Sequence, residues 1–201
     1  MQPTQILKNE HRIIEQVLAS LQGIIDQAAG QGKLDGQSSR QALDFFRNFA
    51  DGCHHGKEEN HLFPLLESKG FSRSQGPTCV MRHEHELGRH LLRAMAGEIE
   101  HAESGNVPAL ERFCRHASTY IQLLRDHIFK EDHRLFPMAD GVLTDAEQVQ
   151  LAESFTIVES QDMGPGKHEK YLAIANELAD RFHVPRAGLN SPLPMCCSHH
   201  G

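Results

Sequence analysis

The chain has 201 residues, of which 39% are hydrophobic and 6% aromatic, with no Trp, a composition that favours helices over a β-sandwich. Its formal charge of −7 gives no indication of binding to nucleic acid or to an acidic membrane surface. No apolar run approaches the roughly 20 residues of a membrane span, and the N-terminus lacks the basic start and apolar core of a secretion signal, so a cytoplasmic protein is expected.

The first predicted helix covers residues 4–29, where apolar residues such as Leu7 and Leu18 recur at spacings of three and four. His11 lies on the same stripe, at a position where an apolar side chain is expected. A histidine directed into a helix bundle needs a polar partner or a metal ion. A polar, Gly-containing stretch at 30–39 follows and is predicted to be a loop.

The second predicted helix covers residues 39–63. Its apolar face leads to His54 and, one turn later, to Glu58. A His and a Glu four residues apart share one face of a helix, which is the separation that two ligands of one metal centre need. Pro64 is expected to end this helix or to kink it.

The second half of the chain repeats this order. A third helix, predicted at 78–103, carries His85 on its apolar stripe, and a fourth, predicted at 107–136, carries His127 and Glu131 four residues apart. By the helical period of about 100° per residue, each of these histidines faces inward.

Two segments show the repeat directly: HHGKEENHLFP (54–64) and HIFKEDHRLFP (127–137) align without a gap. The aligned pairs are His54 with His127, Lys57 with Lys130, and Glu58 with Glu131. Upstream, His11 aligns with His85 at a shift of 74 residues. Two helical hairpins of one ancestry predict an all-α protein whose centre is an up-down four-helix bundle, and bundle interiors commonly hold metal sites.

A C-terminal helical pair should follow the bundle. Thr144 and Glu147 form a capping-box signature that opens a helix to about residue 159, and residues 167–182 predict a further amphipathic helix. These helices are expected to pack across the bundle or to form a dimer surface, so the protein is a monomer or a homodimer.

The predicted domains are therefore a bundle at 1–140, a helical extension at 141–184 and a disordered tail at 185–201. The tail contains a possible transition-metal tract, Cys196, Cys197, Ser198, His199 and His200. The five Cys are odd in number and lack framework spacing, so reduced thiols are expected.

Four inward imidazoles and two inward carboxylates exceed what one ion requires. We therefore predict two metal ions, each with two terminal histidines, and both glutamates as bridges. Nitrogen and carboxylate ligands without a thiolate suit Fe, and also Mn or Zn. The predicted terminal ligands are His11, His54, His85 and His127, and the predicted bridges are Glu58 and Glu131.

Four further residues are alternative ligands. His55 and Glu59 also have a spacing of four, but the face that leads to His55 carries Asp44, Asn48 and Asp51, which is typical of a solvated surface. Asp132 lies five residues after His127 and fits the repeat less well than Glu131. Glu15, one turn after His11, is the last candidate.

The order H…HxxxE…H…HxxxE, with each HxxxE running into LFP, resembles the haemerythrin-like (HHE cation-binding) family over about residues 4–140. The resemblance implies an up-down bundle around a non-haem di-iron centre with an oxo, hydroxo or water bridge. Oxygen carriers of this family have a second His one turn after the third-helix His, where this chain has Arg89. They also have an Asp five residues after the fourth-helix His, where this repeat favours Glu131.

The more symmetric ligand set resembles bacterial members that handle peroxide, nitric oxide or iron. The resemblance therefore implies binding or turnover of dioxygen, hydrogen peroxide or nitric oxide, and so a possible detoxifying oxidoreductase. A non-catalytic oxygen, redox or iron sensor, a carrier and an iron-delivery protein are the alternatives. Iron–sulfur repair proteins share such a bundle but carry an N-terminal domain with a Cys pair, whereas this sequence begins directly at the predicted bundle, so that assignment is less expected.

Overall fold

A computed structural model describes residues 2–159 and 166–188 of the chain. All regular elements within these residues are helical, as predicted. In chain order they are α1 (Pro3–Gln31), α2 (Gly36–Phe45), the π-helical segments η1 (Phe46–His55) and η2 (Glu58–Leu62), α3 (Phe63–Ser68), α4 (Pro77–Glu103), α5 (Val107–Lys130), the π-helical segment η3 (Glu131–Leu135), α6 (Phe136–Val142), α7 (Asp145–Ile157) and α8 (Lys167–Arg181).

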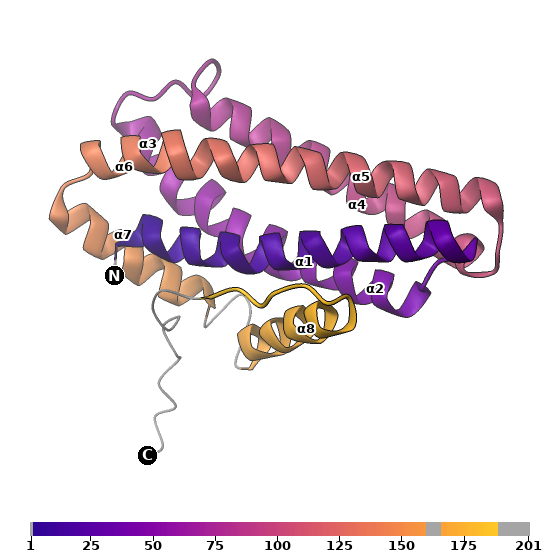
Figure 1. Cartoon of the computed structure of the whole chain (residues 1–201). Coiled ribbons are helices and arrows are strands. Elements are labelled where there is room, and N and C mark those ends of the chain that lie inside the picture. Colours follow the sequence, from indigo (N-terminus) through magenta and orange to yellow (C-terminus); the bar gives the residue numbers. More distant parts are fainter. Residues whose placement is uncertain (1, 160–165, 189–201) are drawn as a thin grey trace.

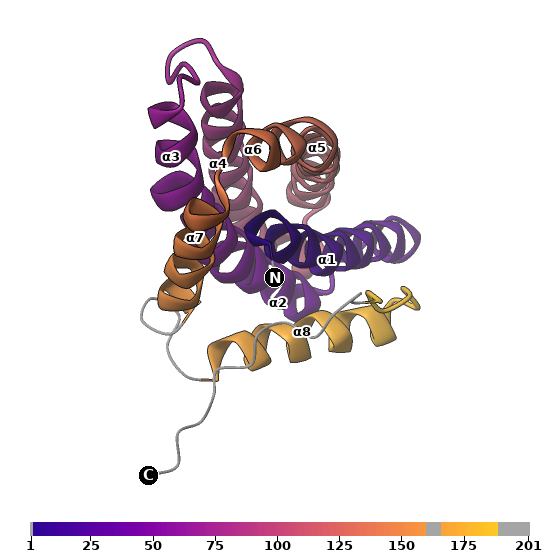
Figure 2. The same cartoon turned by 90° about the vertical axis from the view of Figure 1, so that its left-hand side faces the viewer.

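Four long rods make up the bundle: α1, the rod from α2 to α3, α4, and the rod from α5 to α6 (Figure 1). The end-on view places α7 and α8 along one side of these rods (Figure 2). There α8 contacts α1 and α2, and α7 contacts α1 and η2. The predicted C-terminal helices therefore pack across the bundle.

The second rod does not end at Pro64, in contrast to one of the outcomes expected for it. Proline has no backbone N–H, and its ring crowds the carbonyl one turn earlier. The turn before Pro64 is widened: the Phe63 N–H bonds to the Glu58 carbonyl, five residues earlier. The helix therefore continues into α3. In the fourth rod, η3 lies before Pro137 in the same way.

A layer of buried polar side chains divides the apolar core into two clusters. One cluster includes Phe46 and, from α8, Tyr171. The other includes Phe63, Phe136 and, from α7, Phe155. The buried histidines and glutamates lie between these clusters on all four rods. Since burying ionisable groups without partners is costly, this layer is where a bound cation is expected.

The start of α7 matches its predicted capping box, because the Thr144 side chain accepts the Glu147 N–H and the Glu147 side chain accepts the Thr144 N–H. Of the predicted tail, only residues 185–188 are described, and the Ala187 N–H donates there to the Gln16 side chain at 2.5 Å. The tract from Cys196 to His200 lies outside the described residues.

Two expectations from composition can also be compared with the structure. The cysteines in the described part of the chain, Cys53, Cys79 and Cys114, are free thiols. Burial raises the pKa of the Cys53 thiol to about 12, so this thiol stays protonated. Among the described residues, none of the helices combines the length and the apolar character needed to cross a membrane.

Candidate metal centre

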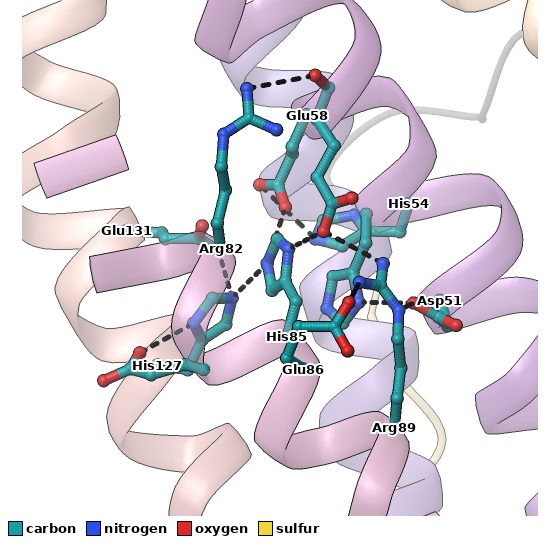
Figure 3. Close-up of polar contacts among 12 residues, drawn as sticks. Asp51, His54, Glu58, Arg82, His85, Glu86, Arg89, His127 and Glu131 are labelled. Atoms are coloured by element: carbon teal, nitrogen blue, oxygen red, sulfur yellow. Dashed lines mark hydrogen bonds and ion pairs between the residues drawn. The ribbon is translucent and has the colours of Figure 1, made fainter. Parts of the chain in front are cut away.

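Five histidines and two glutamates from all four rods meet in the polar layer. They are His11 from α1, His54 and His55 from η1, Glu58 from η2, His85 from α4, His127 from α5 and Glu131 from η3. All seven side chains are buried. Figure 3 shows how several of them point toward one another from different helices.

The donor atoms of these side chains form two groups, and within each group they all lie within 4.8 Å of one another. The three-histidine group consists of His55, His85, His127 and Glu58. The two-histidine group consists of His11, His54, Glu58 and Glu131. Glu58 belongs to both groups, so its position is that of a bridging ligand.

The two carboxylates each span the groups. The oxygen-to-nitrogen distances are 3.7 Å from Glu58 Oε1 to His54 Nε2, 3.5 Å from Glu58 Oε2 to His85 Nε2, 3.3 Å from Glu131 Oε2 to His11 Nε2, and 3.2 Å from the same oxygen to His127 Nε2. Two donors that bind one ion at about 2.1 Å lie roughly 3.0–3.5 Å apart. The separations are therefore close to those of atoms around common ions.

Most of these donor atoms have no other partner in the described structure. Neither oxygen of Glu58 or Glu131 makes a hydrogen bond, and the same is true of Nε2 of His11, His54 and His55. Buried polar atoms are nearly always satisfied. The donor set therefore fits a bound cation.

The charges of the two buried carboxylates support the same conclusion. Burial and the neighbouring Glu131 raise the pKa of Glu58 well above its ordinary value. Burial acts on Glu131 in the same direction, but His127 and His11 hold the pKa of Glu131 well below its ordinary value. A divalent cation between the carboxylates would remove the repulsion that Glu58 experiences.

Each of the five imidazoles has a carboxylate behind it, at Nδ1. The Nδ1-to-oxygen distances are 2.7 Å for His11 and Asp132, 2.8 Å for His54 and Glu10, 3.3 Å for His55 and Asp51, 2.6 Å for His85 and Glu59, and 2.9 Å for His127 and Glu84. An Nδ1–H that donates to a carboxylate leaves the Nε2 lone pair directed into the centre. This arrangement is typical of metal-binding histidines.

Cationic side chains form ion pairs with these outer carboxylates, and one such pair, between a lysine and a glutamate, is found in both halves of the repeat. Lys57 forms an ion pair with Glu10, and Lys130 forms an ion pair with Glu84. Arg12 contacts Asp132 in the same manner. The lysines that align in the repeat therefore have equivalent positions behind His54 and His127.

Arg89 supports two of the outer carboxylates. Its guanidinium lies 2.8 Å from Asp51 and 2.9 Å from Glu59. Figure 3 shows Arg89 beside Asp51. In the family resemblance, this is the position at which oxygen carriers have an additional histidine. Here the additional imidazole near the centre is His55, which comes from the second rod.

The Phe of each LFP triplet contacts the histidine of the opposite half. Phe136 stacks on His11 with ring centroids 5.5 Å apart, and Phe63 stacks on His85 with centroids 5.9 Å apart. Both phenyl rings are fully buried. They therefore limit the orientation of the two imidazoles and close the apolar side of the centre.

The inference that His55 lies on a solvated face with Asp44, Asn48 and Asp51 is wrong. His55 is only 4% exposed, and it belongs to the three-histidine group. The reason is the π-helical turn in η1, where the Gly56 N–H bonds to the Asp51 carbonyl five residues earlier. Such a turn departs from the period of 100° per residue, so two successive histidines both reach the interior.

The structure separates the remaining candidates from the principal six, which it brings together. Glu59 and Asp132 occupy equivalent positions in the repeat and contact Nδ1 of His85 and His11 rather than the centre. Glu15 is 38% exposed and pairs with Arg12 at 2.9 Å. The centre thus has three histidines on one side and two on the other, instead of the predicted two and two.

The outer carboxylates Glu10, Glu84 and Asp51 are not predicted from the sequence, and neither is a role for Lys57. The repeat in the sequence could have identified two of these carboxylates. Glu10 and Glu84 directly precede His11 and His85, so they share the 74-residue repeat shift.

The chain is similar in sequence to several known proteins. The "Uncharacterized protein Rv1995" of Mycobacterium tuberculosis H37Rv is 24% identical over 174 residues, which are 87% of this chain and 66% of the relative. The "Iron-sulfur cluster repair protein YtfE" of Edwardsiella ictaluri is 34% identical over 101 residues, which are 49% of this chain and 45% of the relative. The protein of that name from Escherichia coli K12 is 34% identical over 92 residues, 43% of this chain and 40% of the relative.

The chain thus spans slightly less than two thirds of the mycobacterial relative and less than half of the repair proteins. No solved structure matches it significantly. The sequence model described as "Hemerythrin HHE cation binding domain" matches residues 2–139, which contain all seven central side chains. The chain therefore belongs to the hemerythrin HHE cation-binding domain family.

Proposed function

We propose that this protein holds two iron ions at the centre of an up-down bundle, where it binds or turns over dioxygen, hydrogen peroxide or nitric oxide. The observation that carries the proposal is the convergence of seven buried donor side chains, most of whose inward atoms lack any other partner. Nitrogen and carboxylate donors without a thiolate suit iron, while Mn and Zn are the alternatives. A bound pair of iron ions would supply reversible electron exchange with the small oxidant.

The side chains around the centre select for a small ligand. The apolar clusters on both sides of the polar layer exclude bulk water. If both carboxylates bridge, the ion at the two-histidine group has one protein donor fewer than the ion at the three-histidine group, and it is the one that we expect to accept an incoming ligand. The outer carboxylates hold the Nδ1 protons and thereby keep Nε2 available on each ring.

Two measurements on the iron-loaded protein distinguish an enzyme from a carrier or a sensor. Oxygen evolution from hydrogen peroxide over many turnovers supports an enzyme. A spectral change with dioxygen or nitric oxide that reverses on removal of the gas, without turnover, supports a carrier or a sensor. Protein that shows neither reaction, although it contains two iron ions per chain, contradicts the proposed handling of small oxidants.

Iron delivery is a second candidate, because two of the relatives are named iron–sulfur cluster repair proteins. Their similarity covers less than half of this chain, so the activity in their name is a proposal for it. Anaerobic incubation of the iron-loaded protein with an iron-free cluster protein tests this role. Transfer of iron that outpaces release to solution supports delivery, and release at the same rate contradicts it.

A further inference from the structure

The C-terminal extension reaches the metal centre through one buried lysine. Lys57 is fully buried, and its ammonium contacts Glu10 and, at 2.5 Å, Glu159. Glu159 lies two residues after the end of α7, outside the part of the chain that matches the family. Glu10 in turn accepts the Nδ1–H of His54 at 2.8 Å. A continuous line of contacts therefore leads from the extension to the two-histidine group.

The repeat provides an internal comparison, because the second half contains the same three groups without the extension. There Lys130 pairs with Glu84, and Glu84 contacts His127. The Lys130 side chain is 35% exposed, and no second carboxylate contacts it within residues 2–159 and 166–188. Glu159 therefore makes the two halves of the centre unequal.

Packing around Lys57 shows that α7 belongs to this arrangement. Phe155 is buried in the second apolar cluster, and its ring centroid lies 5.8 Å from the Lys57 ammonium. The Glu159 side chain is 6% exposed. Two buried carboxylates share one buried ammonium, so this site carries a net negative charge next to His54.

We propose that Glu159 is a positioning residue of the metal centre, which acts on His54 through Lys57 and Glu10. By sharing the Lys57 ammonium, Glu159 leaves more negative charge on Glu10 for the bond to His54. A stronger acceptor at Nδ1 makes Nε2 a better metal donor and orients the ring. This inference rests on the proposed function, because it requires that the centre hold metal.

The test compares Glu159→Gln with Glu153→Gln in the full chain. Glu153 is exposed on α7, so its substitution makes the same charge change within the C-terminal extension but away from Lys57. Both variants and the unmodified protein are loaded anaerobically with Fe(II), and affinity is measured by competition with a chelator. We expect Glu159→Gln to lower the affinity for one of the two ions by about 10-fold. We also expect it to shift the reduction potential of the centre to a more positive value.

Two further variants separate positioning from a general effect on folding. Glu159→Asp retains the charge and should recover part of the lost affinity and of the potential shift. If Glu159→Gln does not fold, the potential of Glu159→Asp relative to Glu153→Gln provides the test. Glu10→Gln, which changes the carboxylate between Lys57 and His54, should lower the affinity for the same ion.

The outcomes distinguish this inference from the proposed function. If the unmodified protein binds no iron, the proposed function fails. If it binds two ions, but Glu159→Gln matches Glu153→Gln in both affinity and potential, only the role of Glu159 is refuted. A loss of thermal stability with an unchanged potential in the loaded protein would also refute it, because it would show a structural role alone.

Discussion

The imidazole rings of His55 and His85 stack nearly parallel, with centroids 3.8 Å apart and an interplanar angle of 14°. The rings come from different rods, and the Nδ1 atom of each faces an acidic side chain that Arg89 also contacts. His55 is therefore held as firmly as the histidine that the repeat predicts. The centre has five imidazoles rather than four.

Replacing His55 tests its membership of the three-histidine group. We expect His55→Ala to reduce the metal content by about one ion per chain, because the group that loses a donor also loses affinity, while the two-histidine group keeps its donors. Metal analysis after desalting measures this change. His83→Ala is the matched control, since His83 is exposed on α4. Equal metal content in both variants would exclude His55 as a ligand.

Replacing Glu58 should have opposite effects on metal binding and on the stability of the metal-free protein. Glu58→Gln removes the shared carboxylate, so we expect loss of both ions. Because burial and Glu131 raise the pKa of Glu58, its ionisation costs stability as the pH rises above the pKa of the unfolded chain. The variant without metal should therefore be more stable at pH 7, by roughly 1–3 kcal/mol.

Urea unfolding in the presence of a chelator measures that stability. The difference in stability between Glu58→Gln and the unmodified protein should shrink as the pH falls toward the ordinary pKa of a glutamate. Glu58 is then protonated in the unfolded chain as well as in the folded one, so it is as neutral as the glutamine that replaces it. A variant that is less stable than the unmodified protein at pH 7 would contradict the repulsion between Glu58 and Glu131.

Metal affinity should increase with pH. Burial would lower the pKa of His127, but Glu131 and Glu84 raise it to about 9, so this imidazole carries an extra proton at pH 7 in the absence of metal. A ligand must be neutral, and the ion therefore displaces that proton. We expect affinity at the three-histidine group to rise by at least about tenfold per pH unit up to about pH 9, and more steeply where Glu58, whose pKa is also raised, still holds a proton that the ion must displace.

His54 should contribute nothing to this dependence, because burial lowers its pKa to about 4 and it is already neutral. Competition titrations at several pH values, corrected for protonation of the chelator, give the slope. Proton release in weak buffer gives an independent count. An affinity that does not change between about pH 6 and about pH 9 would show that no proton is displaced.

The two repeated lysines should differ strongly in their contribution to stability. Lys57→Met leaves Glu10 and Glu159 buried without their cation, and we expect a loss of about 3–5 kcal/mol. Lys130→Met removes an ion pair that is partly exposed, with an expected loss of about 1 kcal/mol or less. Urea unfolding of the two variants compares them directly. Equal losses of stability would mean that the second carboxylate, Glu159, does not increase the contribution of Lys57.

Much of the architecture could be predicted from the sequence. Apolar residues at helical spacing identify the four rods, and the ungapped repeat indicates that His54 and His127, with Glu58 and Glu131, lie at equivalent places. The capping box of Thr144 and Glu147 and the amphipathic pattern at 167–182 also predict the C-terminal helices. These features depend on local periodicity, which a single sequence carries.

The rest depends on contacts between distant segments and on turns that break the period. The π-helical turn that brings His55 inward has no clear signature in a pattern analysed at 100° per residue. Burial of Lys57 depends on Glu159, which lies more than 100 residues later in the chain. Similarly, Glu59 and Asp132 have ligand-like spacing, and only the three-dimensional arrangement places them behind His85 and His11.

Diffraction from crystals of the iron-loaded protein, measured on both sides of the iron absorption edge, would locate the proposed ions. We predict two anomalous peaks per chain, with Glu58 between them. One lies among His55, His85 and His127, and the other lies beside His11 and His54. A single peak, or iron bound away from these side chains, would contradict this prediction.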